Sequence, residues 1–149
     1  MTAPAIVLGI GQTAAGDDGV GPAVARALAA RGLAVCESAD AFILLALLEA
    51  GHRVVVVDAV AGGGPPGTVL QLDADALAPG TPLLSSHGIG VADAIALART
   101  LYGDRALERL AIVGVAIDRP TVHAIGLSPA VAGAIGPAAA LAAALAAGG

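Results

Sequence analysis

The chain has 149 residues, of which 57% are hydrophobic, and a formal net charge of −5 at pH 7. This length suits one ordinary domain with a full hydrophobic core, so we expect a single domain over residues 1–149. Seven arginines, no lysine and two aromatic residues argue against a nucleic-acid partner, because such a partner requires a basic surface. Cys36 is the single cysteine, which excludes an internal disulfide framework and favours a reducing, cytoplasmic location.

Strands and helices are predicted to alternate along the chain, as in an α/β fold. Gly32 and Gly51 occupy the positions of helix C-caps, and Asp40 that of an N-cap. Ser128 followed by Pro129 is typical of the start of a last helix. We expect strands at residues 6–8, 33–37, 53–58, 68–72 and 110–117, and the earlier helices at 22–31, 41–50 and 91–101.

Two features constrain how these strands form a sheet. Residues 54–57 are four consecutive valines, which is typical of a strand that is buried on both faces of a parallel sheet. The connector 61–67 is too short for the crossover that a parallel neighbour needs. The fourth strand is therefore predicted to run antiparallel to the others.

The C-terminal stretch Pro129–Ala147 is apolar and long enough to raise the question of a membrane span. It is mostly alanine, is interrupted by Gly133, Gly136 and Pro137, and has no basic flanks. These features favour an amphipathic helix packed on the core, so we expect no membrane partner.

The stretch from residue 6 to residue 21 has two competing interpretations. Gly9-x-Gly11-x-x-Ala14 fits the dinucleotide-binding fingerprint, and Glu37 has the position of its ribose-binding acid. However, a bound phosphate needs free backbone N–H groups and a positive potential at this position. Asp17 and Asp18 lie there instead, and their carboxylates would repel the phosphate and occupy its donors. Carboxylates on a loop at the end of a strand are better suited to holding a cation, which we favour.

Three residues are candidate ligands of such a cation. Asp18 follows the first strand, Asp58 ends the third, and His87 begins the loop before the third helix. If the first and third strands are neighbours, about 4.8 Å apart, their terminal loops can share one ion, whereas an intervening second strand would widen the site. Two carboxylates and one imidazole suit nickel or zinc.

Each of these residues also has an ordinary structural interpretation. Asp17 or Asp18 can favour a helix N-terminus, Asp58 can be a strand-terminal cap, and His87 can be a loop histidine. Adjacent residues in a turning loop do not point the same way, so Asp17 is expected to matter less than Asp18 for metal.

Four blocks of the sequence resemble those of the hydrogenase maturation endopeptidases, and together they cover nearly the whole chain. The blocks are GIGQTAAGDDGVG (9–21), VDA (57–59) with PGT (66–68), SH (86–87) with GVAD (90–93), and GLSP (126–129). The resemblance implies a three-layer α/β/α sandwich whose five-stranded mixed sheet has the order 2-1-3-5-4, with strand 4 antiparallel. It also implies that Asp18, Asp58 and His87 contact the metal. Gln12 departs from the asparagine usual in the family, which affects expectations about loop geometry and substrate preference.

The resemblance further implies an endopeptidase that removes the C-terminal extension of a nickel–iron hydrogenase large-subunit precursor after nickel insertion. Nickel is then supplied by the substrate, and zinc or cadmium is expected to substitute in vitro. Water is the expected attacking group, with Asp17 or a ligand carboxylate, Asp18 or Asp58, accepting its proton. We expect a monomeric enzyme whose partner is the large-subunit precursor. A dinucleotide-binding domain and a non-enzymatic nickel-binding accessory protein are the alternatives.

Overall fold

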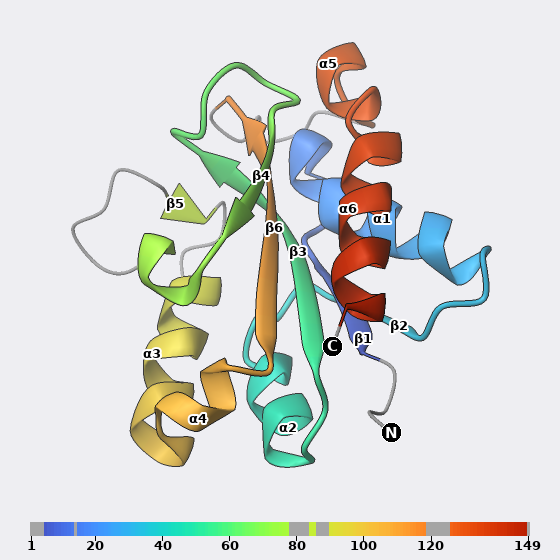
Figure 1. Cartoon of the computed structure of the whole chain (residues 1–149). Coiled ribbons are helices and arrows are strands. Elements are labelled where there is room, and N and C mark those ends of the chain that lie inside the picture. Colours follow the sequence, from blue (N-terminus) through green and yellow to red (C-terminus); the bar gives the residue numbers. More distant parts are fainter. Residues whose placement is uncertain (1–4, 14, 78–83, 86–89, 119–125, 149) are drawn as a thin grey trace.

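A computed structural model of the chain describes residues 5–13, 15–77, 84–85, 90–118 and 126–148. Within these residues a mixed sheet lies between two layers of helices (Figure 1). The strands are β1 (Ile6–Ile10), β2 (Val35–Ser38), β3 (Val54–Ala61), β4 (Val69–Leu72), β5 (Leu84–Ser85) and β6 (Leu110–Ile117). The α-helices are α1 (Val20–Ala29), α2 (Ile43–Glu49), α3 (Val91–Tyr102), α4 (Asp104–Leu107), α5 (Pro129–Ala132) and α6 (Ile135–Ala147). Two short 3-10 helices are η1 (Gly16–Gly19) and η2 (Ala74–Leu77).

The sheet has the order β2-β1-β3-β6-β4, so the predicted order 2-1-3-5-4 is confirmed, the fifth predicted strand being β6. β1 pairs in parallel with both β2 and β3, and β3 pairs in parallel with β6 over its whole length. β4 is antiparallel to β6, as the short connector predicted, with Val69 opposite Val115. The two-residue strand β5 was not predicted; it pairs antiparallel with the end of β3.

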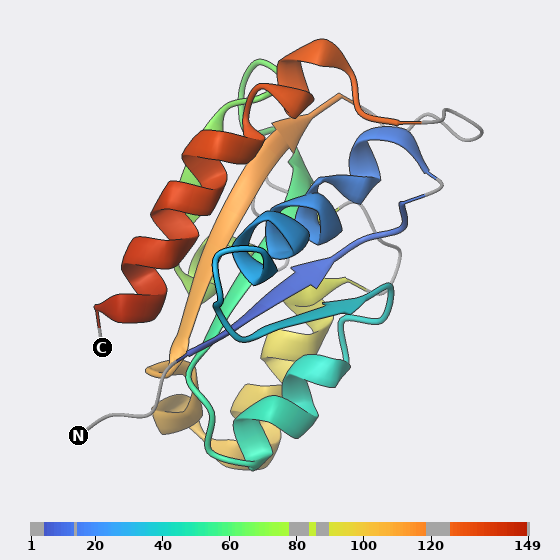
Figure 2. The same ribbon diagram turned by 90° about the vertical axis from the view of Figure 1, so that its right-hand side faces the viewer.

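Both faces of the sheet are covered, as the valine run predicted. Alternate side chains of β3 enter two separate cores. Val55 and Val57 pack in the core beneath α1 and α6, whereas Val54 and Val56 pack in the core beneath α2 and α3. Figure 2 shows α1 and α6 on one side of the strands and α2 and α3 on the other. The predicted three-layer α/β/α fold is therefore confirmed.

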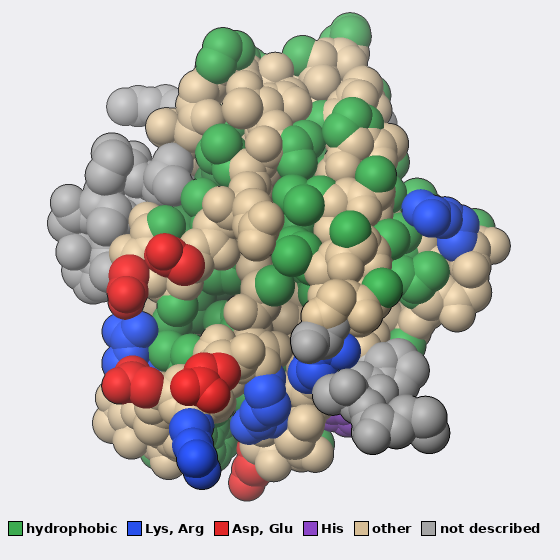
Figure 3. Space-filling view, viewed as in Figure 1, with side chains coloured by type: hydrophobic (Ala, Val, Ile, Leu, Met, Phe, Trp, Pro, Cys, Tyr) green, Lys and Arg blue, Asp and Glu red, His purple; other side chains and the backbone are tan. Residues whose placement is uncertain are grey.

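The C-terminal stretch forms two helices instead of the single helix expected. α5 ends before Gly133, and α6 packs on α1 through one face that carries Ala138, Ala142 and Ala146. By length and composition, Pro129–Ala147 is the one stretch of the described residues that could cross a membrane; its mean hydropathy is 1.9, and 28% of the window is buried. The opposite face of α6 carries exposed alanines, so the helix is not amphipathic (Figure 3).

Candidate active site

Asp58 lies inside β3, four residues after its start, and is fully buried. The sequence predicted that the third strand would end at Asp58, which is wrong. Pairing with β6 continues to Ala61, and Val60 and Ala61 also pair with β5. Because side chains alternate along a strand, Asp58 shares the face of Val56 and Val60, which is the face covered by α2 and α3.

Asp18 lies in η1, directly before α1, and its side chain is also buried, with 4% exposure. One of its oxygens, Oδ2, accepts a hydrogen bond from the backbone N–H of Gln12 at 3.0 Å. Gly11 makes this folded-back loop possible, because a Cβ there would overlap the carbonyl oxygen of Asp18. The loop after β1 is thus closed on itself around the Asp18 carboxylate.

The carboxylate of Asp17 points to a different partner, as expected for adjacent residues in a turning loop. Its Oδ1 accepts a hydrogen bond from the backbone N–H of Ser128 at 2.6 Å, and its Oδ2 accepts one from the Ser128 hydroxyl at 2.9 Å. Ser128 is the N-cap residue of α5, as predicted, but its hydroxyl donates to Asp17 instead of capping the helix. No local pattern in the sequence would have linked these two residues.

Asp18 and Asp58 lie on neighbouring elements of the fold. β1 and β3 are adjacent, which is the arrangement that a shared ion requires, and η1 contacts β3 directly. His87 lies outside the described residues. Its described neighbours are Ser85, which pairs with Val60, and Gly90, the N-cap residue of α3. In the part of the chain that the structure describes, no three His, Cys, Asp or Glu residues form a cluster suited to a metal.

The glycines of the dinucleotide fingerprint have a packing role in this structure. A Cβ on Gly9 would collide with the backbone of Gly21, so both glycines allow α1 to begin directly against the sheet. Glu37 forms an ion pair with Arg26 at 2.8 Å, and Ala14 lies outside the described residues. The backbone N–H of Gln12, a donor that a phosphate would need, is bound by Asp18. These contacts favour the cation interpretation over the dinucleotide one.

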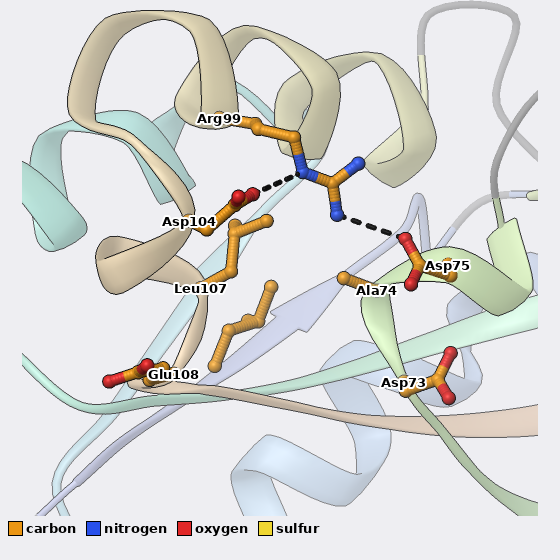
Figure 4. A pocket seen from close by; sticks show the side chains of 8 residues that line it. Asp73, Ala74, Asp75, Arg99, Asp104, Leu107 and Glu108 are labelled. Atoms are coloured by element: carbon orange, nitrogen blue, oxygen red, sulfur yellow. Dashed lines mark hydrogen bonds and ion pairs between the residues drawn. The ribbon is translucent and has the colours of Figure 1, made fainter.

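A large open pocket of about 690 Å³ lies away from these carboxylates, between η2, α3 and α4 (Figure 4). It includes Leu110, the first residue of β6, and therefore lies at the amino end of that strand. Arg99 binds Asp75 at 3.0 Å and Asp104 at 2.9 Å, and the hydrogen bond to Asp75 is the main cause of its raised pKa. Ligands of α/β sheets bind at the carboxyl ends of the strands, so this pocket lies outside the candidate site.

Comparisons with known proteins identify the family of this chain. The HycI family, described as hydrogenase maturation protease, matches residues 38–145, which include Asp58 and His87 but not Asp17 or Asp18. No curated protein matches the chain.

Several solved structures have the same fold. The [NiFe] hydrogenase maturation protease HybD from Thermococcus kodakarensis is 26% identical, with a TM-score of 0.74 and coverage of 97% of this chain and 99% of that one. The hydrogenase maturating endopeptidase HybD from E. coli is 24% identical, with a TM-score of 0.70 and coverage of 93% and 89%. The HycI protease from T. kodakarensis is 20% identical, with a TM-score of 0.71 and coverage of 96% and 92%. Since the family match spans well over half of the chain, the protein belongs to the hydrogenase maturation protease family.

Proposed function

We propose that this endopeptidase removes the C-terminal extension of a nickel–iron hydrogenase large-subunit precursor, and that it recognises nickel already bound to that precursor. Membership of the protease family supports the reaction class. The observation that supports the recognition of nickel is the burial of two carboxylates on elements that contact each other, Asp18 in η1 and Asp58 within β3.

Two buried carboxylates are oxygen donors of the kind that a divalent cation takes. Aspartate is rarely buried to this extent unless it is paired, hydrogen-bonded or bound to a metal. Asp58 shares its face of the sheet with α3, the helix that follows His87 in the chain. We therefore propose His87 as the third ligand, which adds the nitrogen donor that nickel favours over a further carboxylate.

In this proposal the nickel ion belongs to the substrate and is held there by thiolates. The protein contributes Asp18, Asp58 and His87 as additional ligands, which orient the scissile bond, and the ion supplies Lewis-acid polarisation of the carbonyl. Both oxygens of Asp17 are engaged by Ser128, so we assign the water proton to a ligand carboxylate, Asp18 or Asp58, instead of Asp17. Zinc or cadmium at high concentration should occupy the same site.

The deciding experiment compares a nickel-loaded precursor with the same precursor prepared without nickel. Purified enzyme should shorten the loaded precursor only, which a mass shift on a gel or in a mass spectrum reports. Asp18→Asn and Asp58→Asn should each lower the cleavage rate by about 100-fold or more, because metal binding supplies several kcal/mol of transition-state stabilisation. Asp73→Asn, which changes an exposed aspartate outside the proposed site, is the matched control and should cleave normally.

Two outcomes would contradict the proposal. Cleavage of the nickel-free precursor in the presence of a strong chelator would show that nickel is not the recognition element. Tight binding of the nickel-loaded precursor without any cleavage would indicate a nickel-binding accessory protein instead of a protease.

A further inference from the structure

We infer that Asp17 is a positioning residue: by binding Ser128 it sets the direction in which the adjacent Asp18 presents its carboxylate. The consequence for catalysis rests on the proposed function, but the positioning itself is a property of the protein alone. Three features support this inference: the hydrogen bonds within the loop, the hydrogen bonds of Asp17 to Ser128, and the close packing of α5, the helix that Ser128 precedes.

The loop after β1 is a compact unit with its own hydrogen bonds. The N–H of Ala15 donates to the carbonyl of Gln12 at 3.1 Å, and the N–H of Asp18 donates to the carbonyl of Ala15 at 3.2 Å. The N–H of Gln12 also donates to Asp18 Oδ2 at 3.0 Å. These bonds fix the shape of the loop, so a rotation of the loop as a whole would carry the Asp18 carboxylate with it.

Two attachments oppose such a rotation. At the start of the loop, the N–H of Gly11 donates to the carbonyl of Ser38 on β2 at 3.0 Å. At its end, Asp17 holds Ser128 through both carboxylate oxygens, at 2.6 and 2.9 Å. Two simultaneous bonds to a charged acceptor define the orientation of Asp17, and this constrains the backbone of the next residue. The two adjacent carboxylates therefore have different partners. Asp17 binds Ser128, outside the loop, and Asp18 binds Gln12, within the loop.

Ser128 precedes a helix, α5, that is packed closely against the sheet. Its hydrogen bonds to Asp17 therefore hold the loop to a fixed part of the fold. Val131 in α5 is fully buried, and α5 contacts β6. The first turn of α5 also packs closely on the connection between β3 and β4, because a Cβ on Gly67 would overlap the carbonyl oxygen of Ala130. Gly67 is itself bound to β6 through its N–H, which donates to the carbonyl of Ala116 at 2.8 Å. Asp17 therefore joins the loop after β1 to a fixed part of the same edge of the sheet.

Amide hydrogen exchange of Gln12 in the metal-free protein tests the positioning directly. Asp17→Ala removes both bonds to Ser128, and we expect the Gln12 amide to exchange about 10-fold faster, the equivalent of about 1.4 kcal/mol. Ser128→Ala removes the hydroxyl alone and should give a smaller increase, whereas Ser128→Thr keeps a hydroxyl and should restore the wild-type rate.

Controls separate this role from a general loss of structure. The amide of Val56, in the centre of β3, should keep its protection in all variants. Asp73→Ala is a matched change, because the Asp73 carboxylate likewise accepts a backbone hydrogen bond, from the N–H of Ala76 to its Oδ1 at 2.9 Å. This variant should leave the Gln12 amide unchanged. Unchanged exchange of the Gln12 amide in Asp17→Ala would overturn the inference, as would equal acceleration in Asp73→Ala.

A zinc titration then tests whether Asp17 acts through Asp18. Asp17→Ala should raise the zinc Kd by about 10- to 100-fold, which is typical of residues that orient metal ligands. In the Asp18→Ala background the same substitution should have no further effect on zinc binding. A full effect of Asp17→Ala without Asp18 would contradict positioning and indicate that Asp17 is itself a ligand. If the wild-type protein binds no zinc, the proposed function fails, and the exchange experiment still decides the inference.

Discussion

Helix α1 begins in contact with the backbone of β3: a Cβ on Gly21 would lie 2.5 Å from the carbonyl oxygen of Val57. Val57 immediately precedes Asp58, and Gly21 lies three residues after Asp18. The absence of a side chain at Gly21 therefore lets the loop with one buried aspartate approach the strand with the other. The close approach explains the glycine without any bound phosphate.

Gly21→Ala should destabilise the protein because the added methyl group must displace backbone atoms of β1 and β3. We expect a loss of about 1–3 kcal/mol in the free energy of unfolding, measured by urea denaturation. Gly136→Ala is the matched control, since Gly136 is also helical but has no atom within 4 Å of the position that an added methyl group would take. The control should gain up to about 1 kcal/mol from helix propensity. Equal stability of the two variants would contradict the close packing at Gly21.

Metal binding should depend directly on Asp18, Asp58 and His87, whereas Asp17 should act only through Asp18. Zinc at 100 times its Kd should stabilise the wild-type protein by about 2.7 kcal/mol through mass action. Asp18→Ala, Asp58→Ala and His87→Ala should each lose this gain, measured as the shift in Tm when zinc is added. Any one of them that keeps the full shift identifies a residue that is not a ligand.

Asp17→Asn and Asp18→Asn form a matched pair for the same measurement. An asparagine at residue 17 can still accept from the N–H of Ser128, and its amide can donate to the Ser128 hydroxyl oxygen. The Asp17→Asn variant should therefore keep most of its zinc stabilisation, whereas Asp18→Asn should lose it. Equal loss in both variants would contradict the assignment of Asp18 as the ligand.

Tyr102, at the end of α3, should titrate above the ordinary tyrosine pKa. Burial is the main cause of its raised pKa, followed by the charge of Glu49 and a hydrogen bond to that carboxylate. A pKa that is raised on folding contributes stability that is complete below the unfolded pKa of about 10 and is lost as pH rises through the folded value. The wild-type protein should therefore lose stability above about pH 10 more steeply than Tyr102→Phe.

Because Tyr102 is the single tyrosine, its tyrosinate absorbance reports its pKa directly. Glu49→Gln should lower that pKa towards the ordinary value without abolishing the part due to burial. An unchanged titration in Glu49→Gln would show that the contact between α2 and α3 does not involve this pair.

Local sequence features determined much of the fold. Four consecutive valines predicted a strand buried on both faces, because a parallel sheet covered by helices requires apolar side chains on either side. The short connector after β3 predicted the antiparallel direction of β4, since chain length limits which edge the next strand can reach. The glycines predicted to end the first two helices, Gly32 and Gly51, have the positive φ that such positions require. Asp40 was predicted to cap the second helix, but α2 begins later, with Phe42 as its N-cap, and Asp40 instead accepts a hydrogen bond from the N–H of Phe42 in the turn before it.

Other features depended on contacts between distant segments, which no local pattern encodes. The residues alone left open whether β1 adjoins β3, and the pairing of Ile6 with Val54 settles it. The extension of β3 past Asp58 arises from its pairing with β5 and β6. The partner of Asp17 is Ser128, 111 residues further along the chain. The sequence by itself determined that the side chains of two adjacent aspartates would point in different directions. The tertiary structure decided what each one binds, because a carboxylate accepts from whichever donor the folded chain brings within reach.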